Sequence, residues 1–213
     1  MIAAVNLLVG VAMGLNLLAL GSSRLPSVIR AVAAQGMVLG LIPLLMEHRF
    51  DWRVALVAAV TVAVKGFVIP GLLQRAMRVA NIEREIEPFI GFVPTLLLGA
   101  GGTIAAVAGA RALPLLPEHL GTLLVPGALA SVLTGFVLLI GRVKAIGQVC
   151  GYLILENGIY LFGLLLIQST PLLVESGILL DLVVGVFVIG IIVDRIQRAF
   201  DSLDTRKLTA LRE

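Results

Sequence analysis

Stretches of about 20 apolar residues follow one another along the whole chain. A stretch of this length crosses the hydrocarbon core of a bilayer as an α-helix. Of the 213 residues, 14% are charged, against about 25% in a typical soluble domain. A soluble protein with a large core is therefore excluded, and we predict an all-α, polytopic transmembrane helix bundle.

Charged residues, proline or glycine separate the apolar stretches from one another. We predict about seven spans, at residues 2–20, 28–46, 53–73, 88–110, 120–140, 145–168 and 172–193. Residues 1–193 would form a single transmembrane bundle, and residues 194–213 a polar tail spaced like a short amphipathic helix at the membrane surface. The longest connection, 74–87, contains the run ANIEREIE, whose period suits a short interfacial helix.

The basic residues predict the orientation of the bundle. With seven spans, twelve Lys and Arg residues fall on the side of the C-terminus and three on the other side. Under the positive-inside rule the N-terminus faces out and the C-terminus is cytoplasmic, in the cytoplasmic (inner) membrane of a prokaryote. The sequence pI of about 9.5 could suggest nucleic acid as a partner. The basic residues are dispersed between apolar spans, however, so membrane topology explains them better.

The sequence offers no pattern typical of a metal or cofactor site. Cys150 is the single cysteine, so an intrachain disulfide or a Cys-rich cluster site is excluded. His48 and His119 both fall in predicted loops and share no ligand spacing. We therefore expect no catalytic, cofactor-binding or metal-binding residues in this chain.

Small residues at four-residue spacing indicate where helices could approach closely. Such pairs are Gly10 with Gly14, Gly36 with Gly40, and Gly147 with Gly151. They are common in membrane helices, so they indicate packing and say little about function.

Three ionisable residues lie deep within predicted spans: Lys65, Glu156 and Asp181. A charged residue at the centre of a membrane helix costs about 2.5–3.5 kcal/mol on insertion scales, and three would cost roughly 8–10 kcal/mol if left isolated. We therefore expect these side chains to face the bundle interior and to pair, bind water or become neutral.

The span 145–168 carries further polar side chains around its glutamate. Gln148, Tyr152 and Glu156 are spaced i, i+4, i+8 and line one helix face, with Asn157 beside it. Such a stripe can hold a chain of water molecules. In the next span Asp181 lies between two glycines, and Gln35 is an uncharged polar residue in the span 28–46.

Two interpretations of the buried charges remain open. Lys65 could pair with Glu156 or with Asp181 simply to fix helix packing, although buried pairs often stabilise little. Alternatively, two acids and one base in a bilayer could carry protons or ions, the usual role of intramembrane ionisable groups.

Several motifs carry a resemblance to a known family. The stretches GQVCGYLILENGIYLFGLLL, ESGILLDLVVGVFVIGIIVDRI and FDSLDTRKLTAL, together with KGFVIPGLL, resemble component E of hydrogenase 4. That family belongs to the group 4 membrane-bound nickel–iron hydrogenases, which are similar to respiratory complex I. Residues 119–193 resemble the three-helix K subunit of complex I and the C subunit of multisubunit cation/proton antiporters.

The resemblance implies a non-catalytic membrane subunit of a hydrogenase-4-like oxidoreductase. Such a subunit would contribute to a lateral proton path between a redox arm and antiporter-like subunits. Glu156 and Asp181 would carry protons, Lys65 would supply the charge that influences them, and the remaining stripe residues would order water. The nickel–iron centre and iron–sulphur clusters would lie on partner subunits, and lipid, not nucleic acid, would surround this chain.

Two other classes compete with this expectation. The chain could be a purely structural assembly subunit of such a complex or of a multisubunit cation/proton antiporter. A stand-alone secondary transporter is opposed by the short chain and by the absence of an obvious inverted repeat.

Overall fold

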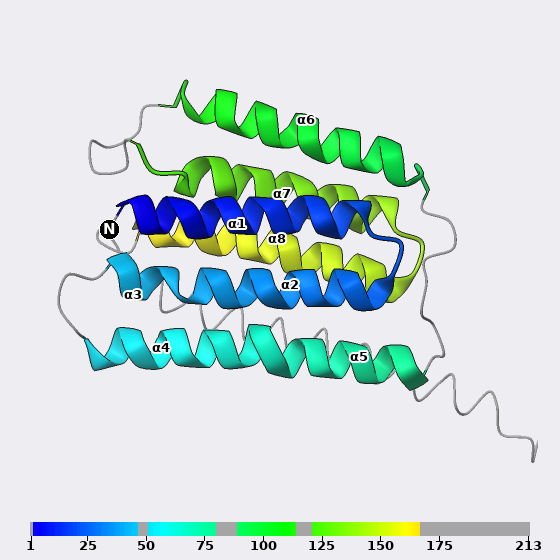
Figure 1. Cartoon of the computed structure of the whole chain (residues 1–213), viewed down its shortest axis with the longest axis horizontal. Helices are drawn as coiled ribbons and strands as arrows, with labels where there is room; N and C mark the ends of the chain where they lie inside the picture. Colours follow the sequence, from blue (N-terminus) through cyan, green and yellow to red (C-terminus); the bar gives the residue numbers. More distant parts are fainter. Residues whose placement is uncertain (1, 47–50, 80–88, 114–120, 167–213) are drawn as a thin grey trace, which may run out of the picture.

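The computed structural model describes residues 2–46, 51–79, 89–113 and 121–166, and its regular elements in these ranges are all helical (Figure 1). The helices are α1 (Ile2–Gly21), α2 (Leu25–Gly40), α3 (Ile42–Met46), α4 (Trp52–Ala63), the π-helix η1 (Val64–Val68), α5 (Ile69–Val79), α6 (Phe92–Ala110), α7 (Leu124–Gly141) and α8 (Ala145–Leu166).

Within the described ranges, six helices are long and apolar enough to cross a membrane, which confirms the predicted all-helical membrane protein. They run over Ile2–Gly21, Leu25–Met46, Trp52–Arg78, Phe92–Ala110, Leu124–Gly141 and Ala145–Leu165. The predicted seventh span, 172–193, and the tail, 194–213, lie outside the described residues. The total of seven membrane spans and the orientation of the bundle stay predictions.

The third span is longer than predicted. It was expected to end near residue 73, with residues from 74 onward in the connection, but α5 continues to Val79. Leu73, Ala76 and Met77 are buried, so the apolar side of this segment packs against the bundle and the helix continues. The charges of Arg75 and Arg78 are accommodated because they lie near the end of the span.

The second span is divided by a proline. Pro43 has no backbone N–H, so it cannot donate the helical hydrogen bond to the carbonyl of Leu39. The chain tightens at this point, where the N–H of Leu41 donates to Val38 O at 3.3 Å. Consequently α2 ends at Gly40 and the short helix α3 begins at Ile42.

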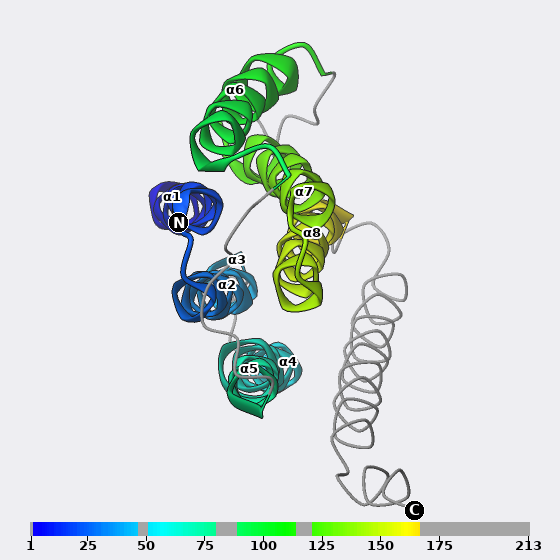
Figure 2. The ribbon, with the colours of Figure 1, turned by 90° about the vertical axis from the view of Figure 1, so that its right-hand side faces the viewer.

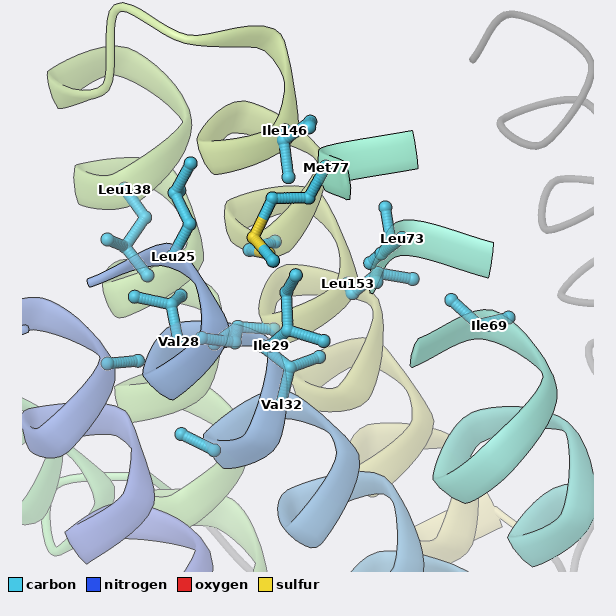
Figure 3. Close-up of a cluster of buried hydrophobic side chains, with 14 of the residues drawn as sticks. Leu25, Val28, Ile29, Val32, Ile69, Leu73, Met77, Leu138, Ile146 and Leu153 are labelled. Atoms are coloured by element: carbon cyan, nitrogen blue, oxygen red, sulfur yellow. The ribbon is translucent and has the colours of Figure 1, made fainter. Parts of the chain in front are cut away.

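The described helices form two rows that pack face to face (Figure 2). One row contains α1, α2 and the continuous helix α4–η1–α5, and the other contains α6, α7 and α8. Across the rows α1 contacts α6 and α7, and α2 contacts α8. Apolar side chains from both rows fill part of this interface. Figure 3 shows Leu25, Val28, Ile29 and Val32 of α2 facing Leu153 of α8 and Met77 of α5.

Buried Arg142 joins the two rows at one end of the bundle. Its Nη2 donates to the carbonyl oxygens of Ala19, Leu20 and Ser22 at 3.1–3.2 Å. The carbonyls of Ala19 and Leu20 belong to the C-terminal end of α1, where helical acceptors lack intrahelical partners and a cation is favourable. Ser22 lies in the turn that follows. The turn between α1 and α2 is thereby held against the turn between α7 and α8.

Candidate functional site

Lys65 enters the interface between the two rows from the π-helical turn η1. π-Helical turns are rare and occur frequently at functional sites. The backbones of α2 and η1 approach closely at this point: a Cβ atom on Gly36 would lie 2.7 Å from Cβ of Lys65. Glycine at this position therefore lets the lysine side chain leave its helix directly beside α2.

Lys65 forms a buried ion pair with Glu156 of α8. Nζ of Lys65 lies 3.5 Å from Oε1 of Glu156, and each residue is 8% exposed. The ammonium also lies 5.2 Å from the centre of the Tyr160 ring, a cation–π arrangement. The structure thus selects Glu156 as an ionic partner of Lys65, one of the two partners that the sequence left open.

A chain of hydrogen bonds continues from this pair into the bundle. Lys65 Nζ donates to Asn157 Oδ1 at 3.0 Å, and Asn157 Nδ2 donates to Gln35 Oε1 at 3.1 Å. Gln35 Nε2 then donates to Asn16 Oδ1 at 2.7 Å, and Asn16 Nδ2 donates to Ser131 Oγ at 3.0 Å. All of these residues are buried.

Two buried oxygens beside the ion pair lack hydrogen-bond partners among the described residues. They are Oε2 of Glu156 and the hydroxyl oxygen of Tyr160, one helical turn further along α8. A carboxylate oxygen can accept a proton and a phenol can both donate and accept one. The site therefore has the chemistry to take up and release a proton, whereas no cluster of three or more His, Cys, Asp or Glu side chains forms within the ranges described above.

The predicted stripe on α8 is divided by the fold. Glu156 and Asn157 lie at the ion pair, and Tyr152 is half-buried. Gln148 is exposed near the start of α8, where Nε2 donates to the carbonyl of Arg142 at 3.0 Å. Asp181 lies outside the described residues. The roles of these residues in a proton path stay predictions.

Asn16 and Ser131 belong to the polar network but are not among the predicted site residues, and Gln35 was predicted only to be a polar residue of its span. None of the three carries a charge, whereas the predicted site started from the charged residues within the spans. The available signal was an amide inside an apolar run, as in MGLNLLALG around Asn16. Buried polar groups need partners, so each amide predicts a partner without identifying it.

Comparisons with known proteins identify relatives but no solved structure. No protein-family model matches the chain, and no solved structure matches it. The uncharacterised protein Rv0085 of Mycobacterium tuberculosis is 36% identical over 191 residues, which cover 89% of this chain and 87% of that protein.

The relatives with a named role are proteins called hydrogenase-4 component E. The Escherichia coli K12 protein is 30% identical over 152 residues, covering 70% of this chain and 68% of its own length, and the Shigella flexneri protein gives the same values. The resemblance seen in the motifs is thus supported by an alignment over 70% of the chain. The chain belongs to the family of hydrogenase-4 component E.

Proposed function

We propose that this chain is a non-catalytic integral membrane subunit of a hydrogenase-4-like, complex I-related oxidoreductase and forms part of a lateral proton path. Family membership supports the assignment to a hydrogenase-like membrane complex. In this proposal the path runs between the redox arm and antiporter-like subunits. The nickel–iron centre, the iron–sulphur clusters and the electron chemistry belong to partner subunits.

The observation that carries the proton path is the buried Lys65–Glu156 pair, in which the carboxylate oxygen Oε2 has no hydrogen-bond partner among the described residues. Removing two charges from water is expensive, and a buried pair often stabilises a protein less than apolar side chains of the same volume. A pair in the bilayer is therefore poorly explained by stability alone. Oε2 of Glu156 faces the interior without a hydrogen bond from the described residues, so it can receive a proton from water or a neighbouring acid.

Each predicted site residue has a role in this proposal. Glu156 and Asp181 carry the proton in turn, and Lys65 provides the positive charge that favours the ionised carboxylate after the proton leaves. Gln148, Tyr152 and Asn157 order water or hold the charged groups.

Replacing Glu156 with glutamine tests the proton path. Glu156→Gln keeps the size and polarity of the side chain but removes its proton-carrying group. We expect the complex to assemble and to keep hydrogen-dependent electron transfer, while proton translocation per turnover falls by about tenfold or more. Inverted membrane vesicles with a pH-sensitive fluorescent dye measure translocation, normalised to electron-transfer rate.

Asp51→Asn is the matched control for this experiment. It makes the same acid-to-amide change at the exposed N-cap of α4, where asparagine caps a helix about as well as aspartate. Translocation should stay at the parental level in this variant. Parental translocation in Glu156→Gln would contradict the proton role of Glu156.

A purely structural assembly subunit is the second candidate, favoured by the hydrogen bonds that connect helices of both rows. Exchange of the two charges, Lys65→Glu with Glu156→Lys, separates the candidates. An inert pair tolerates the exchange, so assembly and translocation would both persist. A proton path requires the carboxylate on α8, so we expect assembly with strongly reduced translocation.

A further inference from the structure

The hydrogen-bonded chain that starts at Lys65 has a fixed direction. An ammonium group has donors and no acceptor, so Asn157 must present its oxygen to Lys65 and its NH₂ group to Gln35. The same requirement passes to Gln35 and then to Asn16. The orientation of all three amides is therefore determined by the charge at one end, and the chain finishes at the hydroxyl of Ser131.

The chain crosses the interface between the two rows more than once. Lys65 comes from η1, Gln35 from α2 and Asn16 from α1, all in the first row, whereas Asn157 and Ser131 come from α8 and α7 in the second row. Gln35 is at the centre of the chain, because its Oε1 accepts from Asn157 and its Nε2 donates to Asn16. The same Nε2 atom also donates to Ser131 Oγ at 3.4 Å. Gln35, Asn16 and Ser131 are fully buried.

Neutral amides hold a charge in place but do not carry protons. The donor of an amide is nitrogen and its acceptor is oxygen, so a proton accepted at oxygen is not the one released from nitrogen. This branch therefore differs from the carboxylate branch at Glu156, where one group accepts and releases the proton at oxygen.

We propose that Asn16, Gln35 and Ser131 are positioning residues that orient the Lys65 ammonium through Asn157 and thereby set its placement beside Glu156. The hydroxyl of Ser131, at the far end of the chain, contributes to the geometry of the ion pair between η1 and α8. The effect of this positioning on proton translocation rests on the proton path proposed above, whereas its effect on the placement of the ammonium does not.

Two variants on α7 test the proposal. Ser131→Ala removes the hydroxyl that accepts from Asn16. Thr134→Val is the matched control, because Thr134 lies one turn away on the same helix and its buried hydroxyl has no hydrogen-bond partner within the described part of the chain. Removing an unpartnered buried hydroxyl should be neutral or stabilising.

The first measurement follows the ammonium itself in the full-length subunit. The chain contains three lysines, so lysine labelled with ¹⁵N at Nζ gives few resonances, and Lys65→Arg identifies that of Lys65 by its disappearance. We expect Ser131→Ala to shift the Lys65 resonance and Thr134→Val to leave it in place. An unshifted resonance in Ser131→Ala, or equal shifts in both variants, would overturn the positioning role.

The second measurement compares translocation with assembly in the intact complex. Gln35→Leu removes the centre of the chain and with it the hydrogen bond that orients Asn157. We expect this variant to lower protons translocated per electron by about fivefold, the factor for loss of that one buried hydrogen bond. It should also alter the pH profile of translocation. Ser131→Ala should have a smaller effect in the same direction, and Ser131→Thr, which keeps a hydroxyl, should restore the parental profile. A role in packing alone would lower the amount of complex and leave the ratio and the pH profile unchanged.

The outcomes separate this inference from the proposed function. If Glu156→Gln abolishes translocation but Gln35→Leu and Ser131→Ala leave the ratio and the Lys65 resonance unchanged, the positioning role is wrong and the proton path stands. If Glu156→Gln translocates like the parent but Ser131→Ala shifts the resonance, the proton path is wrong and the positioning role stands. Should Gln35→Leu fail to assemble, Ser131→Ala with its control decides the question.

Discussion

Replacing Gly135 and Gly158 with alanine is expected to separate α7 from α8 and to prevent the subunit from accumulating in the membrane. A Cβ atom on Gly135 would lie 2.5 Å from the backbone nitrogen of Leu155, and one on Gly158 would lie 2.7 Å from that of Val132. Backbone atoms cannot rotate away, so the helices must move apart. Each substitution should cost about 3 kcal/mol, the upper end of the range for overpacked cores. The amount of subunit in membranes and its thermal unfolding in detergent measure this loss.

Gly101→Ala is the control for the same chemical change. Gly101 is exposed on α6, and a Cβ atom there would meet nothing within 4 Å. Alanine has a higher helix propensity than glycine by about 1 kcal/mol, so this variant should be as stable as the parent or more stable. Normal accumulation of the Gly135→Ala and Gly158→Ala double variant would show that the close approach of α7 and α8 is not required.

Replacing Lys65 with methionine should destabilise the subunit by about 3–5 kcal/mol, the range for a buried ion pair that loses one partner. The substitution leaves the Glu156 carboxylate buried without its counter-charge, and it removes the donor to Asn157 Oδ1. The midpoint of thermal unfolding of the purified subunit in detergent measures the effect. Lowering the pH should restore part of the loss, because a protonated carboxyl group needs no counter-charge.

The double variant Lys65→Met with Glu156→Met provides the comparison. Replacement of both members of a buried pair by apolar side chains is often neutral or stabilising, so its midpoint should return toward that of the parent. An equal loss in the single and double variants would indicate that the methionine side chain at residue 65 disturbs packing and that the charge is of little importance.

The positions of the spans could be predicted because hydropathy acts on whole segments. The six predicted spans that correspond to described helices begin and end within four residues of the observed ones, except at the end of the third span, where α5 continues to Val79. At that end hydropathy falls while amphipathic packing continues, since Met77 is buried beside exposed Arg75. Hydropathy averaged over a window cannot separate the two faces of such a segment.

The candidate site was predicted less completely because it depends on which helix faces meet. The charges of Lys65 and Glu156 identify both residues from sequence. The prediction that Gln148 and Glu156 line one face of the helix, made from their spacing, was less accurate. Eight residues rotate a helix about 80° beyond two full turns, so the two side chains share a face loosely. Gln148 consequently lies exposed at the helix start, while Glu156 is buried.

The glycine spacing rule identified some of the close helix contacts and missed others. Cβ atoms on Gly10 and Gly14 would meet nothing within 4 Å in the described structure, whereas Gly36 and Gly40 lie against the third span. A Cβ atom on Gly151, a member of the third predicted pair, would lie 2.5 Å from the backbone nitrogen of Leu139. Gly135 and Gly158 approach neighbouring backbone about as closely, at 2.5 and 2.7 Å, although the spacing rule does not identify them. Which small residue is needed depends on the partner helix, and a single helix does not contain that information.

The π-helical turn from Val64 to Val68 lets this helix contain one extra residue. A wide turn accommodates one more residue than an α-helical turn while leaving the segments on either side in nearly the same rotation. Ala58 and Thr61 before the turn, and Leu73 after it, all face the bundle. The extra residue therefore behaves as a local insertion: it is accommodated within the turn that holds Lys65, and the segments on both sides keep their buried faces toward the bundle.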